Sequence, residues 1–462
     1  MDFSGFESVF SWRYASKEMR SIWSEEHKRH LLRKVWVALA RAQNGFGLVS
    51  DEELADICSH EGDVDIERSL EIEKETHHDL MAEIKAFSEQ CPIGGGKIHL
   101  GATSTDILDN AEAIRIRESF ALVIARVRSI LSVLSGFIRK NSSVSAMAWT
   151  HLQSAECTTV GYRFALYAEE FLRVHSELDD FKVLGKGLKG ACGNASSYEI
   201  LLGVDGAENL ERKVLENLGI EAFEVTTQVY PRSQDYRILS LLSEIALACA
   251  KIAIDMRMLQ SSGIGGEVRE AFSKNQVGSS AMPFKRNPIS MEKVSSLCRM
   301  VQSFAQVAWE NGANSILERT LDDSANRRII ISGGFLCIDE ILITVEKTFS
   351  TLELDPVAIK NNLDKFGVYS GTEVLIMEAC KKGADRQVMH EEIRKESMRS
   401  YENLRATGRN NLAELLSDNE YILKYLDKTT IIKHIDAYSS LRFSERRALR
   451  ICDMIGKVLD GA

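Results

Sequence analysis

Residues 278–288 carry the densest group of chemically useful side chains in the sequence. They read Gly-Ser-Ser-Ala-Met-Pro-Phe-Lys-Arg-Asn-Pro, so two hydroxyls, two adjacent cations and an amide lie in one short segment. Two of the 5 prolines of the chain also lie here. Because proline fixes φ and blocks helix continuation, the segment is predicted to be a loop of defined shape. Hydroxyls and cations held in such a loop suit an anionic substrate better than a solvent-facing connector would.

A second polar group, Thr103-Ser104-Thr105-Asp106, follows His99 and precedes a helical run. On spacing alone the favoured interpretation is an N-cap cluster, because these side chains accept hydrogen bonds from the free amides at a helix start. The same free amides and hydroxyls can also bind a carboxylate, which is the functional alternative.

Two histidine-containing segments could supply acid–base groups. Thr150-His151-Leu152-Gln153 leads into a long helical run, and the charged stretch at 71–79 contains His78. Histidine titrates near neutral pH, which suits proton donation to a leaving nitrogen. A lone histidine is nevertheless more often structural, and residues 71–79 are by composition an exposed, charged helix face.

Residues 318–328 place three arginines around a serine. Arg319 and Arg328 lie five and four positions from Ser324, so a helix beginning at Ser324 would carry Arg328 on the same face one turn later. Planar guanidinium groups make bidentate bonds to phosphate, and a hydroxyl complements them. The alternative from composition is a solvated, salt-bridged helix start.

The rest of the sequence predicts a helical scaffold for these groups. No proline occurs between Pro92 and Pro231 or between Pro288 and Pro356, and apolar residues recur there at helical spacing. Long helices are predicted over 111–140, 158–183, 236–261, 289–312 and 323–349. Strand signals are weak, so we expect an all-α protein of three helical domains. They are an N-terminal domain at 1–110, a long-helix bundle with the 278–288 loop at 111–352, and a C-terminal domain at 353–462.

Composition narrows the function classes. The chain has 462 residues, 44% of them hydrophobic and 27% charged, which is typical of a globular protein. Its net charge of −10 disfavours nonspecific nucleic-acid binding, so an anionic substrate would need a local basic site. We expect no membrane association and, from nine dispersed cysteines and the lack of a signal peptide, a cytoplasmic location. No metal-ligand spacing is present.

The 278–288 segment resembles the Gly-Ser-Ser-x-Met-Pro-x-Lys-x-Asn-Pro signature loop of the fumarase/aspartase superfamily, whose members eliminate fumarate from succinyl compounds. Its form Ser-Ala-Met-Pro-Phe-Lys-Arg-Asn-Pro is most similar to the branch that acts on succinylated purine nucleotides. The resemblance covers nearly the whole chain and is tightest at 71–80, 99–106, 278–288 and 318–328. It implies the all-α fold with a central long-helix bundle, and a reaction that needs no redox cofactor.

The resemblance also implies the catalytic roles. Ser279 would be the base that removes a proton from carbon, although chemistry alone would favour a histidine because a serine alkoxide is costly. His151 would be the acid for the leaving nitrogen, with Glu292 raising its pKa. Lys285 and Asn287 would stabilise the dianionic intermediate.

Further side chains are implied to contact the substrate. His78 completes the implied catalytic set, and both His78 and Asp79 would lie beside the substrate. Thr103 and Ser104 would hold the succinyl carboxylates. The arginine-rich segment would hold a phosphate. The implied binding residues are Arg13, Tyr14, Asp79, His99, Thr103, Ser104, Gln228, Ser280, Met282, Asn287, Arg319, Ser324 and Arg328.

The implied substrates are adenylosuccinate, giving AMP, and SAICAR, giving AICAR, each with release of fumarate. The implied assembly is a homotetramer whose active sites are shared between chains. One departure is that Met147-Ala148-Trp149 stands where many relatives have an arginine before the Thr-His pair, so that charge is missing or comes from elsewhere.

Two alternatives stay open at this point. One is another lyase of the superfamily, such as argininosuccinate lyase, fumarase or aspartase. The arginine-rich segment argues against it, since fumarase and aspartase substrates carry no phosphate. The other is a helical scaffold without activity, which the intact Ser279, Lys285, Asn287, His151 and Glu292 argue against.

Overall fold

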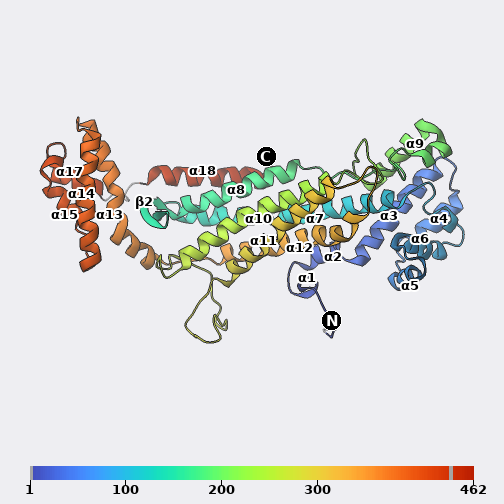
Figure 1. The fold of residues 1–462 in the computed structure, drawn as a ribbon, viewed down its shortest axis with the longest axis horizontal. Coiled ribbons are helices and arrows are strands. Elements are labelled where there is room, and N and C mark those ends of the chain that lie inside the picture. Colours follow the sequence, from blue (N-terminus) through green and yellow to red (C-terminus); the bar gives the residue numbers. More distant parts are fainter. Residues whose placement is uncertain (1–3, 436–440, 462) are drawn as a thin grey trace. The chain divides into compact units, whose positions relative to one another are not determined.

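The computed structural model describes residues 4–435 and 441–461 (Figure 1). The chain forms two compact units, each assembled from three stretches of sequence. Unit 1 comprises Met1–Arg126, Ser176–Leu247 and Ser296–Ile343, and unit 2 comprises Val127–His175, Ala248–Ser295 and Thr344–Ala462. The sequence-based division at residues 110 and 352 stays a prediction.

Long helices dominate both units, and five of them each contain a boundary between the units. They are α7 (Ser104–Asn141), α8 (Val160–Asp180), α10 (Ser233–Gln260), α11 (Ile289–Ala313) and α12 (Asp322–Ser350). All five predicted long helices are therefore confirmed. Ring contacts join them inside each unit: Phe120 of α7 meets Phe335 of α12 in unit 1, and Phe137 of α7 meets Phe164 of α8 in unit 2.

The other helices of unit 1 lie wholly within it. They are α1 (Val9–Trp12), α2 (Lys17–Ile22), α3 (Glu25–Asn44), α4 (Asp51–Ser59), α5 (Ile66–Thr76), α6 (Asp79–Gln90), the 3₁₀ turn η1 (Gly95–Lys97) and α9 (Ser196–Leu218).

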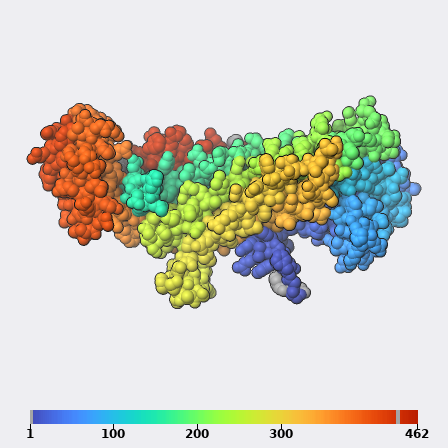
Figure 2. Space-filling model, in the orientation of Figure 1, coloured from blue at the N-terminus to red at the C-terminus, as the bar shows by residue number. Residues whose placement is uncertain are grey.

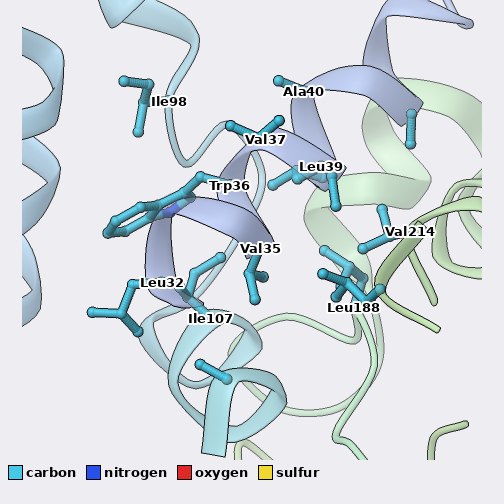
Figure 3. Close-up of a cluster of buried hydrophobic side chains, with 14 of the residues drawn as sticks. Leu32, Val35, Trp36, Val37, Leu39, Ala40, Ile98, Ile107, Leu188 and Val214 are labelled. Atoms are coloured by element: carbon cyan, nitrogen blue, oxygen red, sulfur yellow. The ribbon is translucent and has the colours of Figure 1, made fainter. Parts of the chain in front are cut away.

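The core of unit 1 is built on α3. This helix begins after Ser24, whose side chain accepts a hydrogen bond from the His27 N–H (3.1 Å) and so caps the helix start. Trp36 on its buried face is 2% exposed and belongs to one apolar cluster with Ile107 of α7 and Val214 of α9 (Figure 3). This packing holds α3 and α9 against the first turns of α7, where the Thr103–Asp106 group lies.

Unit 2 contains the few strands among the described residues. Its elements are β1 (Ser145–Thr150), β2 (Gln153–Thr159), β3 (Val268–Arg269), β4 (Glu353–Leu354), α13 (Pro356–Lys381), α14 (Arg386–Thr407), α15 (Leu412–Asp418), α16 (Glu420–Leu423), α17 (Lys428–Ile435) and α18 (Arg442–Asp460).

The β1–β2 hairpin differs from the sequence-based prediction, which began a helix at Thr158. Thr158 and Thr159 instead pair with Ala146 and Ser145 in the antiparallel ladder. The helix starts at Val160 because the Thr159 hydroxyl accepts a hydrogen bond from the Tyr162 N–H (3.0 Å) and caps it.

The connection between α10 and α11 contains the 278–288 loop and stands out from the helices of unit 2 as the yellow projection in Figure 2. Strand β3 within it pairs with β4. The Glu270 carboxylate then accepts hydrogen bonds from the N–H groups of Ser290 (3.1 Å) and Met291 (2.9 Å) at the start of α11. The base of the loop is therefore tied down, while its tip is exposed.

Among the described residues, one helix, α7, meets a length-and-composition criterion for crossing a membrane. Core helices of water-soluble proteins meet the same criterion, so the finding is weak. The absence of membrane association stays a prediction.

Candidate active site

The predicted site residues fall into two groups, one in each unit. Unit 1 holds Arg13, Tyr14, His78, Asp79, His99, Thr103, Ser104, Gln228, Arg319, Ser324 and Arg328. Unit 2 holds His151, Ser279, Ser280, Met282, Lys285, Asn287 and Glu292.

A cationic pocket of about 180 Å³ in unit 1 brings the arginine-rich segment together. Arg319, Ser324 and Arg328 all line it, although α12 begins at Asp322 and not at Ser324. Ser324 therefore lies in the first turn, where the positive end of the helix dipole favours an anion. The pocket also contains Lys28 of α3 and Arg115 of α7. Sequence reasoning missed these two because each is one cation on a charged helix, with no motif around it.

The arginines of this pocket divide into buried and accessible groups. Arg232 pairs with Asp323 (2.8 Å) and Asp109 (3.1 Å) and is 5% exposed, so it holds the wall of the pocket. The side chain of Arg319 pairs with Asp323 (2.9 Å) and is 21% exposed. That of Arg328 is 60% exposed and is the guanidinium best placed to receive a ligand from solvent.

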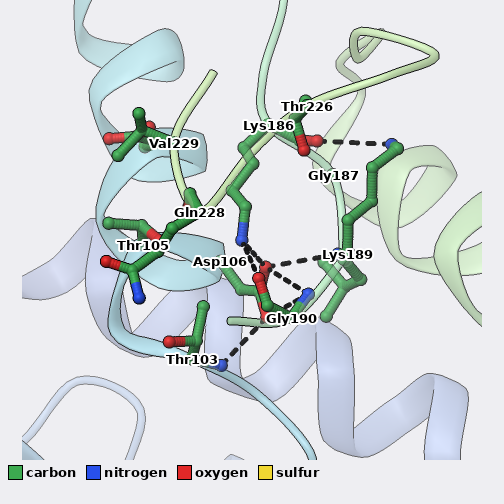
Figure 4. A network of polar contacts seen from close by, with 12 residues as sticks. Thr103, Thr105, Asp106, Lys186, Gly187, Lys189, Gly190, Thr226, Gln228 and Val229 are labelled. Carbon is green, nitrogen blue, oxygen red and sulfur yellow. Dashed lines mark hydrogen bonds and ion pairs between the residues drawn. The ribbon is translucent and has the colours of Figure 1, made fainter. Parts of the chain in front are cut away.

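A buried polar network fixes the Thr103–Asp106 group (Figure 4). The Asp106 carboxylate accepts hydrogen bonds from the N–H groups of Thr103 (2.9 Å) and Gly190 (3.2 Å) and pairs with the Lys186 ammonium. Asp106 and Lys186 are both fully buried. Burial lowers the pKa of Lys186 below its ordinary value, although Asp106 acts in the opposite direction.

The same region leaves two predicted carboxylate-binding hydroxyls available. Among the described residues, neither the Thr103 nor the Ser104 side chain has a hydrogen-bond partner. The Thr105 hydroxyl donates to the Gln228 carbonyl, and the Gln228 N–H donates to the Glu318 carbonyl (3.1 Å). The start of α7, the Gln228 segment and the arginine-rich segment are thereby joined, and this arrangement can bind a ligand that carries several anionic groups.

His99 and His78 lie close enough to influence each other. Burial, with a smaller effect from His78, lowers the pKa of His99 to about 4. Trp36 donates its indole N–H to His99 Nδ1 (3.1 Å), so the neutral ring carries its proton on Nε2. His78 caps α6, with its Nδ1 accepting from the Met81 N–H (3.3 Å). His99 can therefore donate a hydrogen bond from Nε2 to a substrate but cannot act as a cationic acid near pH 7.

The lowered pKa of His99 predicts that the stability of the fold depends on pH. Because the pKa of His99 is about 4 in the folded protein and 6.5 ordinarily, the unfolded chain binds more protons between these values. The free energy of unfolding should fall by at most about 3.5 kcal/mol, at about 1.4 kcal/mol per pH unit, as pH falls from about 6.5 to about 4. Urea unfolding across this range measures the effect, and His99→Gln should reduce it. An equal pH dependence in the variant would contradict the assignment.

In unit 2, the 278–288 segment forms the shaped loop that its prolines predicted. The Ser279 hydroxyl oxygen accepts hydrogen bonds from the N–H groups of Met282 (3.0 Å) and Ala281 (3.3 Å). The Asn287 side chain donates to the Gly278 carbonyl (3.2 Å). A Cβ at Gly278 would clash with the Lys285 carbonyl oxygen, so only glycine allows this closure. Two amides directed at one hydroxyl oxygen would also stabilise its deprotonated form.

His151 lies in the two-residue turn of the β1–β2 hairpin. His151 (φ 53°) and Leu152 (φ 60°) both adopt left-handed backbone conformations, and the Leu152 side chain is 62% exposed. Such turns ordinarily use Asn-Gly, and strained residues of this kind cluster at functional sites. Glu292 lies in the first turn of α11. Within the described residues, no hydrogen bond or ion pair joins His151 to Glu292, so their pairing stays a prediction.

Four further predicted positions have simple surroundings. The Arg13 guanidinium lies 5.6 Å from the Trp12 ring centroid, and the Tyr14 ring meets Phe10 edge-on, so both contact neighbours near α1. Ser280 is exposed, and Met282 is 42% exposed. Among the residues that line the cationic pocket, none of these appears.

In unit 2 an arginine contacts the Met147-Ala148-Trp149 segment, which has no arginine of its own before the Thr-His pair. Arg163 of α8 donates a hydrogen bond to the Met147 carbonyl of β1, and its other arm approaches the Glu267 carboxylate (3.4 Å). A cation therefore does lie beside Met147-Ala148-Trp149, contributed by a residue that no motif indicated.

Comparisons with known proteins show the family to which the chain belongs. A family described as "Lyase" matches residues 12–303. "Adenylosuccinate lyase" of Pyrococcus abyssi is 38% identical over 426 residues, covering 91% of this chain and 92% of the relative. "Adenylosuccinate lyase" of Saccharomyces cerevisiae is 35% identical, covering 91% and 89%.

Solved structures support the fold. A fumarate lyase from Mesorhizobium sp. BNC1 superposes with a TM-score of 0.85 at 22% identity, covering 97% of this chain and 99% of that one. The all-α fold with long central helices is thus confirmed. This chain is a lyase and belongs to the adenylosuccinate lyase family of the fumarase/aspartase superfamily.

Proposed function

We propose that this protein splits adenylosuccinate into AMP and fumarate, and SAICAR into AICAR and fumarate, in purine nucleotide synthesis. The observation that carries the proposal is the convergence of Arg319, Ser324 and Arg328 on one cationic pocket. A guanidinium pair with a hydroxyl suits a phosphate, which both substrates carry and which fumarase and aspartase substrates lack. Incubation with adenylosuccinate should release AMP and fumarate in equal amounts.

The reaction is a β-elimination. Deprotonated Ser279 takes the proton from the carbon next to a carboxylate, and the electron pair left behind forms a dianionic aci-carboxylate. The two amides at the Ser279 oxygen lower the cost of the alkoxide. The C–N bond then breaks, its electron pair goes to nitrogen, and His151 supplies the proton. Lys285 and Asn287 would stabilise the dianion, and the free hydroxyls of Thr103 and Ser104 would hold the succinyl carboxylates.

The phosphate pocket gives a prediction about AMP. Arg319→Ala and Arg328→Ala should each weaken AMP binding by about 1.5–3 kcal/mol, the value of a hydrogen bond to a charged group. Inhibition by fumarate should change much less, since fumarate carries no phosphate. Isothermal calorimetry measures the first effect, with Arg212→Ala as the control, because Arg212 pairs with Glu216 on an exposed face of α9. Unchanged AMP affinity in both variants would place the phosphate elsewhere.

We also propose a homotetramer whose active sites combine residues of different chains. Large apolar side chains are exposed on the long helices, including Leu247 (69%) on α10, Trp309 (52%) on α11 and Ile329 (66%) on α12. Exposed apolar surface of this kind favours contact with a second copy. The exposure of the His151 turn and of the Ser279 loop further supports sites completed by other chains. The cytoplasmic location stays a prediction.

Subunit mixing tests the shared site. His151→Ala and Ser279→Ala proteins should each be inactive alone, yet a mixture should recover activity after subunit exchange, because some sites receive two intact chains. Native mass spectrometry would verify exchange and the fourfold mass. No recovery despite verified exchange would mean that both residues come from one chain, and a monomeric mass would contradict the assembly.

A further inference from the structure

Arg328 already has an anionic partner, although it is the most exposed cation of the proposed phosphate pocket. Its guanidinium lies 2.6 Å from the Asp79 carboxylate, which comes from the first residue of α6. Arg328 lines both the 180 Å³ pocket and a neighbouring one of about 250 Å³, whereas Asp79 lines only the second. The guanidinium therefore lies where the two pockets adjoin, with Asp79 holding it from one side.

We infer that Asp79 is an internal counter-ion that competes with the substrate's phosphate for Arg328 and thereby sets the affinity for nucleotide. The inference rests on the proposed phosphate site and gives Asp79 a different role from the direct substrate contact that the family resemblance implies. A carboxylate repels a phosphate, so direct contact between the two would be unfavourable without a cation between them.

The charges around Asp79 support competition. Burial alone would raise the pKa of Asp79, but Arg328, the Leu80 N–H and Lys28 together hold it below its ordinary value. Asp79 is therefore an anion at neutral pH. Because the side chain of Arg328 is 60% exposed, its ion pair is of the surface type that contributes little stability. A phosphate offers the same guanidinium two charge-assisted bonds, so an exchange of partner is favourable.

Lys28 provides a replacement partner for Asp79. It lines both pockets, and its charge already lowers the pKa of Asp79. Its one ion pair in the described residues is with Glu25 at 3.5 Å, one turn away on α3. When the phosphate takes Arg328, Lys28 keeps the Asp79 carboxylate neutralised, so the exchange leaves no isolated charge beside the bound nucleotide.

The test is the affinity of the full-length protein for AMP and for inorganic phosphate, measured by calorimetry. Asp79→Asn should bind AMP about two- to fivefold more tightly, the range that a surface ion pair allows. The affinity for inorganic phosphate should rise in the same way as the affinity for AMP, and inhibition by fumarate should not change. Asparagine keeps an acceptor for the Leu80 N–H, which donates to Asp79 at 2.7 Å, and Asp79→Ser is a second variant suited to a helix start.

Two comparisons separate exchange at Arg328 from a general loss of negative charge. Glu73→Gln is the matched control, because Glu73 lines the same 250 Å³ pocket without pairing with Arg328. It should tighten AMP binding less than Asp79→Asn does. In a protein that already carries Arg328→Ala, Asp79→Asn should raise the affinity for AMP by no more than Glu73→Gln does.

Weaker AMP binding by Asp79→Asn would overturn the inference and return Asp79 to direct substrate contact. The inference would also be overturned if Asp79→Asn tightened AMP binding as strongly in the Arg328→Ala protein as in the wild type. If the wild-type protein bound neither adenylosuccinate nor AMP, the proposed function itself would fail. That result differs from both outcomes that would overturn the role of Asp79.

Discussion

Ser279→Ala is expected to lower kcat for adenylosuccinate by roughly 10²–10⁴, the usual contribution of a general acid or base. Its hydroxyl oxygen accepts two backbone N–H groups in the free protein, at 3.0 and 3.3 Å. Alanine removes the oxygen and leaves the loop backbone in place, because Gly278 and Asn287 close it independently. His151→Ala should lower kcat by a similar factor, since the leaving nitrogen would lose its proton donor.

Steady-state kinetics with matched controls checks this expectation. Ser273→Ala removes a hydroxyl elsewhere in the α10–α11 connection, where the Ser273 N–H bonds to Gln276, and it should leave kcat within about twofold. AMP affinity should be retained in both catalytic variants, because neither residue lies in the phosphate pocket. Turnover near that of the wild type in Ser279→Ala would remove Ser279 from the role of base.

Asp106→Asn is expected to reduce the free energy of unfolding by about 3–5 kcal/mol, the cost of removing one partner from a buried ion pair. Lys186 and Asp106 are fully buried, and among the described residues the other hydrogen-bond acceptor for the ammonium is the Gly190 carbonyl (2.8 Å). Asparagine would leave that positive charge without its ion-pair partner. The loss should be visible as a lower midpoint in urea unfolding followed by circular dichroism.

A double variant separates the charge effect from a packing effect. Adding Lys186→Met to Asp106→Asn removes the stranded charge, so the double variant should be more stable than Asp106→Asn alone. Asp205→Asn, on an exposed part of α9, should change stability by no more than about 0.5 kcal/mol. If the double variant were the less stable, the ion pair would not be the reason that Asp106 is needed.

The fold was predictable where local sequence determines structure. Long apolar repeats without proline predicted the five long helices, because helical periodicity needs no knowledge of distant contacts. The β1–β2 hairpin was not predictable, since His151-Leu152 has neither the asparagine nor the glycine that marks such a turn. Its conformation depends on packing against α13, for example the Trp149–Phe366 ring contact, which no local signal indicates.

The candidate site was predictable where residues cluster in sequence. The 278–288 loop and the Arg319–Arg328 segment were found because their chemistry is local. Lys28 was not found from the sequence, because it joins the cationic pocket only through tertiary packing. The contact between Arg163 and Met147 was not found either, because it also depends on tertiary packing. The Asp79–Arg328 pair spans 249 positions in the chain, so sequence alone could not show that the two side chains meet.

The most direct test of the account is fumarate release by the purified protein, followed by ultraviolet absorbance, with adenylosuccinate, SAICAR, argininosuccinate, malate and aspartate as separate substrates. The account predicts saturable turnover of adenylosuccinate and SAICAR, one AMP per fumarate from the former, and no turnover of malate or aspartate. No fumarate from adenylosuccinate, or turnover confined to substrates without a phosphate, would contradict it.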